Sequence, residues 1–202
     1  MTELSLNGWP VIQGSGDPRL RTGWEPGADR RLTTRKEALP LFLAVAADWH
    51  RWIHTIDDGA VDTGGYANRD ARAVPGRKSN HASGTAIDID WSGVGAPVAK
   101  NRIFWKTKES QMRRILKIYS ILNWGGDWSP AYWDPMHIEL RPGSNVGNVH
   151  FIIDKLGIGQ DGVRSKNRFG LRCRTLSRRV RWSVHRPGWR LRRPASGRAP
   201  AR

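Results

Sequence analysis

Apolar residues recur at helical spacing in two segments of the chain. The first segment covers residues 39 to 53, and its apolar positions are Leu39, Leu41, Phe42, Val45, Ala46, Trp49 and Ile53. The second segment has apolar residues at Met112, Ile115, Leu116, Tyr119 and Leu122, with Arg113, Arg114 and Lys117 between them. Spacings of three and four residues place such side chains on one face of a helix. We therefore expect two amphipathic helices, the second ending before Asn123.

The start of the first helix has two possible positions. Thr34-Arg35-Lys36-Glu37 fits a capping box, in which a hydroxyl and a carboxylate satisfy backbone N–H groups at the helix start. Pro40 lies too deep for that start, because proline lacks the N–H that an interior helical position needs. The helix is therefore expected to begin nearer Leu39 or to bend there.

Three further segments have the pattern of strands. Residues 87–91 alternate apolar and acidic side chains, as a half-buried strand does. Residues 136–140 follow Pro135, which disfavours helix at the residue before it, so an extended segment is expected there. Residues 61–66 form a third, shorter candidate strand. Helices that flank a small antiparallel sheet make the expected fold class α+β.

Length and composition agree with one compact domain. The 202 residues suffice for a sizeable core, and the 11 tryptophans suit either core packing or a groove that receives glycan or peptide strands. Cys173 is the only cysteine, so an intrachain disulfide cannot form. No segment approaches the roughly 18 apolar residues of a membrane span. The first residues lack a basic region followed by an apolar run, so no signal peptide is expected.

Positive charge is concentrated near the C-terminus. The whole chain carries a net charge of +16, of which residues 161–202 supply +13 and residues 1–160 only +3. We expect a domain over residues 1–160, opened by an irregular arm over residues 1–33. The Arg-rich segment 161–202 shows no helical or strand period and is expected to be a disordered tail. Such a tail either attracts anionic polymers through long-range electrostatics or is a dispensable extension.

Two clusters of polar residues predict a metal site. His81 and Asp88 lie seven residues apart, and Asp134 and His137 follow about fifty residues later. Two imidazoles and a carboxylate suffice for a catalytic zinc ion, because three such ligands leave a fourth tetrahedral position open for water. A second carboxylate beside a ligand can accept the proton of that water. We therefore predict zinc at His81, Asp88 and His137, with Asp134 as general base.

Other polar residues near these clusters have alternative interpretations. Glu139 is expected on the same strand face as His137, where it either orients that ligand or competes with Asp134 as the base. Asp90 shares a face with Asp88 and is an alternative ligand, but solvation or a structural hydrogen bond is a simpler role for it than metal binding. His50 and His54 are four residues apart but lack the glutamate of a helical H-E-x-x-H zinc site, so we interpret them as a helix-surface pair.

At these residues the sequence resembles a known family. Ser-x-His-x-x-Gly-x-Ala-x-Asp at residues 79–88, with Asp-x-x-His at residues 134–137, resembles the zinc peptidases that cut peptidoglycan stem peptides. This family contains D-alanyl-D-alanine carboxypeptidases and L-alanyl-D-glutamate endopeptidases. Three further motifs resemble the peptidase domain of endolysins from actinobacterial phages: Asn7-Gly8-Trp9-Pro10, Gly64-Gly65-Tyr66 and Trp124-Gly125-Gly126-Asp127-Trp128. The resemblance covers roughly residues 4 to 158.

The resemblance implies roles for individual residues. By motif position His81, Asp88 and His137 bind one zinc ion, and Asp134 is the catalytic base. Family members bind substrate through an arginine upstream of the first motif, which implies Arg69 or Arg72 here, and Ser79 is placed beside the substrate. Glu139 is expected to orient His137.

The resemblance also implies a setting for the protein. The expected partner is the peptidoglycan stem peptide, together with anionic wall polymers for the basic tail, and neither a membrane nor a nucleic acid is expected. The chain is expected to be a monomer that is made in the host cytoplasm. It would reach the cell wall through a membrane lesion made by a separate protein. Two other activities remain open, namely a D,D-carboxypeptidase or dipeptidase with the same zinc ligands, and a zinc-binding module without catalysis.

Overall fold

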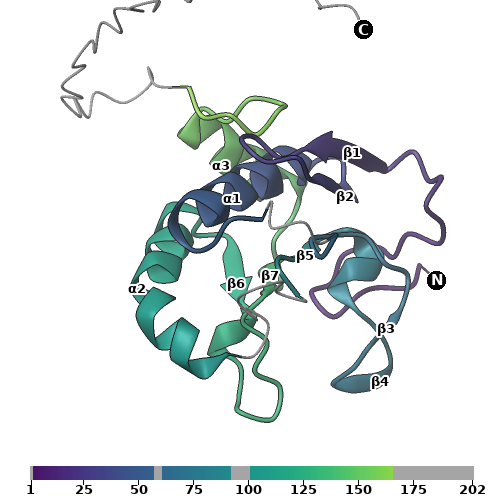
Figure 1. Ribbon diagram of the computed structural model, residues 1–202. Coiled ribbons are helices and arrows are strands. Elements are labelled where there is room, and N and C mark those ends of the chain that lie inside the picture. Colours follow the sequence, from purple (N-terminus) through teal and green to yellow (C-terminus); the bar gives the residue numbers. More distant parts are fainter. Residues whose placement is uncertain (1, 57–60, 92–100, 166–202) are drawn as a thin grey trace, which may run out of the picture. The chain divides into compact units, whose positions relative to one another are not determined.

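The fold combines three helices with small antiparallel sheets. The computed structural model describes residues 2–56, 61–91 and 101–165. Within these ranges the helices are α1 (Leu39–Trp52), α2 (Arg102–Ile118) and α3 (Val146–Leu156). In Figure 1 these helices lie beside a three-stranded sheet of β5 (Ala86–Asp88), β7 (His137–Leu140) and β6 (Leu122–Trp124), with β7 in the centre. The predicted α+β class is thereby confirmed.

Two hairpins and two short turns complete the described part. β1 (Leu20–Trp24) pairs with β2 (Arg31–Arg35), and β3 (Asp70–Ala71) pairs with β4 (Val74–Lys78). The 3₁₀ turns η1 (Asn80–Ser83) and η2 (Gly125–Asp127) precede the site residues of β5 and β7. The segment 1–33, predicted as an irregular arm, contains β1 and the first residues of β2 and is therefore partly regular. Nearer the N-terminus the buried residues are Ser5, Asn7, Trp9, Val11 and Ile12, whereas Leu4 and Leu6 are exposed.

Helix α1 lies at the centre of the core. Its buried residues run almost continuously from Leu39 to Ala46, and Trp49 is fully buried one turn later. A helix that is apolar on nearly all sides must be covered on nearly all sides. Helices α2 and α3 and both strands of the β1–β2 hairpin pack against α1. The core therefore holds the three-stranded sheet and the helices in one unit.

The structure confirms one of the two expected starts of the first helix and lengthens the second helix. Helix α1 begins at Leu39 after the N-cap Ala38, as the position of Pro40 predicts, and Pro40 lies in its first turn, where proline is tolerated. The predicted capping box is wrong, because Thr34 belongs to strand β2. Helix α2 begins at Arg102, ten residues before the first apolar residue of the predicted pattern, and ends at Ile118. Its N-cap Asn101 accepts a hydrogen bond from Phe104 N over 3.0 Å.

The predicted strands are largely present. Strand β7 covers residues 137–140, and β5 covers 86–88, so the alternating pattern of residues 87–91 extends beyond the observed strand. Two residues after the end of β5, Asp90 adopts a left-handed backbone conformation with φ of 59°, which an extended strand does not allow. The segment 61–66 is not a strand, although Gly64 forms one antiparallel bridge with Asp88. That bridge joins the Gly64-Gly65-Tyr66 motif to a predicted metal ligand.

The folded part of the chain continues beyond residue 160. Arg164 Nη2 donates to Asp48 Oδ1 of α1 over 2.8 Å, and Asp48 is buried. Burial raises the pKa of Asp48, while the hydrogen bond from Tyr119 and the charge of Arg164 oppose that rise. Gly162 has φ of 77° and approaches Leu43 so closely that a Cβ atom would collide with it. The predicted boundary after residue 160 therefore lies too early, and the contacts continue at least to Arg164.

The remaining C-terminal residues form a separate unit. The chain divides into Met1–Phe169 and Gly170–Arg202, and the second unit lies wholly outside the described residues, as does Cys173. The predicted disorder of the tail also falls there. In the described part, no helix has the length and apolar character required to cross a membrane.

The contact between Arg164 and Asp48 predicts different outcomes for two truncations. A chain that ends after Ser165 should unfold with the same free energy as the intact chain. A chain that ends after Gln160 should be about 3 kcal/mol less stable, because it leaves a buried carboxylate without its guanidinium. Urea unfolding of both truncations measures the difference. Arg164→Ala in the full chain is the matched control and should reproduce most of the loss; equal stability of the two truncations would contradict the role of this contact.

Candidate metal centre

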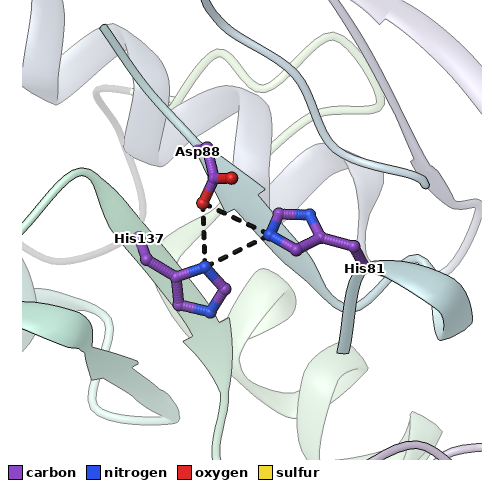
Figure 2. Close-up of side chains that lie close together, drawn as sticks. All are labelled: His81, Asp88 and His137. Carbon is purple, nitrogen blue, oxygen red and sulfur yellow. Dashed lines mark hydrogen bonds and ion pairs between the residues drawn. The ribbon is translucent and has the colours of Figure 1, made fainter. Parts of the chain in front are cut away.

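Three side chains from distant parts of the sequence converge on one point. His81 lies on η1, Asp88 ends β5, and His137 begins β7, where it is paired with Asp88 in the sheet register. Figure 2 shows the three side chains turned toward one another. His81 Nε2 lies 3.2 Å from His137 Nδ1 and 3.2 Å from Asp88 Oδ1. His137 Nδ1 lies 2.8 Å from Asp88 Oδ1. The predicted ligand set is therefore assembled in space.

The spacing of these three atoms fits a tetrahedral metal ion. Nitrogen and oxygen ligands about 2.0–2.1 Å from zinc, at tetrahedral angles, lie about 3.3 Å from one another. The three observed separations are close to this value. Within the described residues, His81, Asp88 and His137 form the only group of three or more such side chains close enough to share an ion. The residues present thus fit zinc with one position left for another ligand.

Hydrogen bonds behind both imidazoles orient them for metal binding. His81 Nδ1 lies 2.6 Å from the carbonyl oxygen of Gly65, so Nδ1 carries the proton and donates it. His137 Nε2 lies 2.9 Å from Glu139 Oε2 and donates to that carboxylate. Each bond leaves the lone pair of the opposite nitrogen facing Asp88. Acceptors behind metal-binding histidines fix both the tautomer and the ring orientation.

The electrostatics of the metal-free group also favour a cation. Burial lowers the pKa of His137, but hydrogen bonds with Asp88 and Glu139 outweigh burial and raise that pKa to about 9. Burial raises the pKa of Asp88, but hydrogen bonds from His137 and His81 outweigh it and hold the pKa below its usual range. Without a metal ion, a proton on His137 supplies the positive charge that the surrounding acceptors require. A bound cation would replace that proton.

The first motif folds as its residue types require. Ser79 accepts a hydrogen bond at Oγ from His81 N over 3.3 Å and caps η1. Gly84 ends η1 with φ of 68°, a left-handed conformation that few other residues adopt easily. A Cβ atom at Gly84 would also lie 2.5 Å from Arg35 N. The glycine therefore allows the chain to turn from His81 into the strand that carries Asp88.

The second motif is held by the preceding Trp124-Gly125 pair. Trp124 Nε1 donates to the carbonyl oxygen of Pro135 over 2.7 Å. Asp134 N donates to Gly125 O over 3.0 Å, and the Asp134 carbonyl accepts from His137 N over 3.0 Å. A Cβ atom at Gly125 would collide with the Asp134 carbonyl. These contacts fix the bend at Asp134 directly before the ligand His137.

The metal group lines two cavities. The first is lined by Asp134, His137 and Glu139, together with the aromatic residues Trp128, Tyr132 and Trp133. The second is lined by His81 and Asp88, together with Gly65, Tyr66 and Trp91. Arg69 and Arg72 line both cavities. The candidate ligands therefore border two spaces that share two arginines.

The predicted substrate residues all lie at these cavities. Ser79 lines the first cavity, although its hydroxyl is already engaged as the cap of η1. Arg69 Nη2 lies 3.8 Å from Asp88 Oδ2 and so contributes positive charge to a metal ligand. Arg72 is exposed and has no acidic partner among the described residues. Their roles in substrate binding stay predictions, as does the role of Asp134 as the base.

The alternative ligand and the histidine pair have structural roles. Asp90 Oδ2 lies 2.9 Å from His54 Nδ1 and accepts a hydrogen bond from Trp49 Nε1 over 3.3 Å. His50 Nδ1 accepts from Ile56 N over 3.2 Å. The interpretation of His50 and His54 as a helix-surface pair is wrong, because His54 lies beyond the end of α1 and contacts buried Asp90. The structural hydrogen bond expected for Asp90 is present.

Comparison with protein families supports the chemistry of the metal group. A family model described as D-alanyl-D-alanine carboxypeptidase matches residues 73–140. The matched segment contains both motifs and supports the zinc carboxypeptidase family. A zinc-dependent metallopeptidase that acts on peptidoglycan peptides is thereby supported at the general level. Arg69 and Arg72 lie just before the match. Searches among curated proteins and among solved structures each found no match.

Two residues at the site were not found from the sequence. Asn80 Nδ2 donates to Glu139 Oε2 over 2.6 Å, so Asn80 contacts the carboxylate that orients His137. The Gly65 carbonyl, which fixes the tautomer of His81, belongs to a motif that was noted only for its resemblance. In the sequence, the one indication that Asn80 belongs to the site is its position directly before His81. Nothing in its residue type distinguished it from an ordinary turn asparagine.

Proposed function

We propose that this chain is a zinc-dependent endopeptidase that hydrolyses peptidoglycan stem peptides, of the kind that phage endolysins use to lyse host cells. The observation that carries the proposal is that the metal group lines two cavities, with His137 at one and His81 and Asp88 at the other. A carboxypeptidase needs to accommodate only the end of a chain beyond the scissile bond. An endopeptidase needs space on both sides of that bond, and the two cavities support the proposal as candidates for this space. The L-alanyl-D-glutamate bond is the proposed target.

The chain's own residues have distinct parts in this reaction. A zinc ion held by His81, Asp88 and His137 would acidify water and polarise the scissile carbonyl. Asp134 lines the same cavity as His137 and is the proposed acceptor of the attacking water's proton. The same carboxyl group would then donate that proton to the leaving amine. Glu139 accepts a hydrogen bond from His137 Nε2. Its proposed role is therefore to orient this ligand and not to transfer a proton.

Two other functions are less well supported. A D,D-carboxypeptidase or dipeptidase would use the same ligands and base, and only the bond that it reaches would differ. A zinc-binding module without catalysis would have no need for a carboxylate such as Asp134 beside the metal group. For the setting, we propose a monomer that reaches the wall through a lesion made by another protein. We propose also that the basic tail attracts anionic wall polymers.

Digestion of purified peptidoglycan tests the proposed function. Mass spectrometry of the released fragments should show new termini at the L-alanyl-D-glutamate bond. A chelator should stop the reaction, and added zinc should restore it. Release of terminal D-alanine alone would replace the endopeptidase with a carboxypeptidase. Stoichiometric zinc without any cleavage would favour the binding module.

The two arginines should respond differently to substitution. Arg72→Ala should lower kcat/KM by about tenfold or more with unchanged zinc content, because a guanidinium fork binds a substrate carboxylate bidentately. Arg72→Lys, which keeps the charge, should recover only part of the rate. Arg69→Ala should instead strengthen zinc binding, since it removes a positive charge near the ligand Asp88 that repels a cation. Kinetics on a soluble muropeptide, with zinc titration of each variant, would separate these effects. Unchanged kcat/KM in Arg72→Ala would exclude it as the substrate residue.

A further inference from the structure

A chain of hydrogen bonds joins the N-terminal segment to the ligand His137. Asn7 N donates to Asn80 Oδ1 over 2.8 Å. Asn80 Nδ2 donates to Glu139 Oε2 over 2.6 Å, and the same oxygen accepts from His137 Nε2 over 2.9 Å. Asn7, Asn80 and Glu139 are 2%, 4% and 8% exposed. All three residues are therefore buried, and Asn80 and Glu139 reach solvent only where they line the first cavity.

The donors and acceptors in this chain fix the orientation of the Asn80 amide. A backbone N–H such as that of Asn7 can only donate, so the oxygen of the Asn80 amide must face it. The amide nitrogen of Asn80 must then face Glu139 and donate to it. The Glu139 carboxylate also accepts from His137 Nε2, which leaves Nδ1 of His137 facing Asp88 and His81 as the nitrogen that can bind a metal ion.

Asn7 is itself fixed by side-chain hydrogen bonds to the ends of two strands. Its Nδ2 donates to Thr85 Oγ1 over 2.9 Å, just before β5, and to Leu140 O over 3.1 Å, at the end of β7. Its Oδ1 accepts from Ser5 Oγ over 2.8 Å. The adjacent Leu6 N donates to Lys78 O at the end of β4. The backbone N–H of Asn7 is thus held in place at the point where Asn80 needs a donor.

We propose that Asn7 and Asn80 are positioning residues for the metal ligand His137, so that the N-terminal segment is a working part of the metal centre. The proposal rests on the proposed zinc site and deepens it. It gives the Asn7-Gly8-Trp9-Pro10 motif a function, although this motif is more than seventy residues from the first ligand in the sequence. Asn80 acts on Glu139, Glu139 acts on His137, and Asn7 fixes the orientation of the Asn80 amide.

Zinc affinity of the full-length chain tests the role of Asn80. Asn80→Ala should weaken zinc binding by about tenfold or more, the loss typical when a partner behind a metal ligand is removed. The measurement is competition with a chelator of known affinity. Asn145→Ala is the matched control, because Asn145 caps α3 and its loss should lower stability without contact to the site. Its zinc affinity should stay within about twofold of the original chain.

A second variant and a spectroscopic measurement separate positioning from general destabilisation. Asn7→Ala should weaken zinc binding less than Asn80→Ala but more than Asn145→Ala. Nitrogen-15 NMR of the zinc-loaded chain should show an Nε2–H proton of His137 that exchanges slowly with water, because buried Glu139 accepts it. The same proton should exchange faster in Asn80→Ala.

The possible outcomes have different consequences. Equal zinc affinities in Asn80→Ala and the original chain would overturn the proposal, and so would an equal loss in Asn145→Ala. If Asn80→Ala weakens zinc binding and Asn7→Ala does not, the N-terminal segment has no part in positioning His137. If Asn80→Ala does not fold, the zinc affinity of Asn7→Ala and the exchange rate of its His137 Nε2 proton decide. Absence of zinc from the original chain would instead remove the proposed metal centre.

Discussion

Replacing both His81 and His137 by alanine should abolish zinc binding and reduce peptidase activity on the order of a thousandfold or more. One remaining carboxylate, Asp88, cannot hold zinc against dilution, because protein zinc sites need at least three ligands. Elemental analysis after dialysis measures the zinc content, and muropeptide cleavage measures the rate. The expected zinc content is one ion per original chain and none in the double variant.

An exposed histidine supplies the control for this experiment. His150 lies on α3 with its side chain exposed, so His150→Ala removes an imidazole without touching the metal group. It should keep full zinc content and full activity. Stoichiometric zinc in the double variant would show that the ion binds elsewhere, and the proposed centre would then be abandoned.

The central elements of the fold follow from local sequence patterns. Helix α1 is predicted because its apolar residues recur at helical spacing and because Pro40 suits a first turn. The start of α2 is not predicted, since most side chains in its first turns are polar or exposed and give no apolar face before Met112. The β1–β2 hairpin is not predicted either. Its glycine-rich and charged sequence resembles a loop, and only the structure shows that its two strands pair with each other and pack on α1.

The metal group is predictable for a different reason. His81, Asp88 and His137 lie in two compact motifs whose residue types and spacing carry the chemistry. The contacts that support them are spread more widely, because 73 residues separate Asn7 from Asn80 and 116 separate Asp48 from Arg164. Asparagine and arginine occur in many unrelated roles. Only the three-dimensional structure shows which of them meet.

Two carboxylates near His137 are candidates for the catalytic base, and their contacts predict different effects of substitution. Asp134→Asn should retain zinc and lose activity on the order of a hundredfold or more, because an amide cannot accept the proton of the attacking water. Glu139→Gln should lower activity less and should weaken zinc binding. Its side chain still reaches His137 and Asn80, but an amide is a weaker acceptor than a carboxylate.

Parallel measurements of zinc affinity and of kcat separate the two assignments. Asp154→Asn is the matched control, because Asp154 is exposed on α3 and the same change there should alter neither quantity. A base should lower kcat at full zinc occupancy, whereas a residue that orients a ligand should act mainly through zinc affinity. If zinc-saturated Glu139→Gln is inactive while Asp134→Asn turns over at the original rate, Glu139 is the base. The role of Asp134 would then be structural only. Its backbone hydrogen bonds with Gly125 and His137 fix the bend before β7.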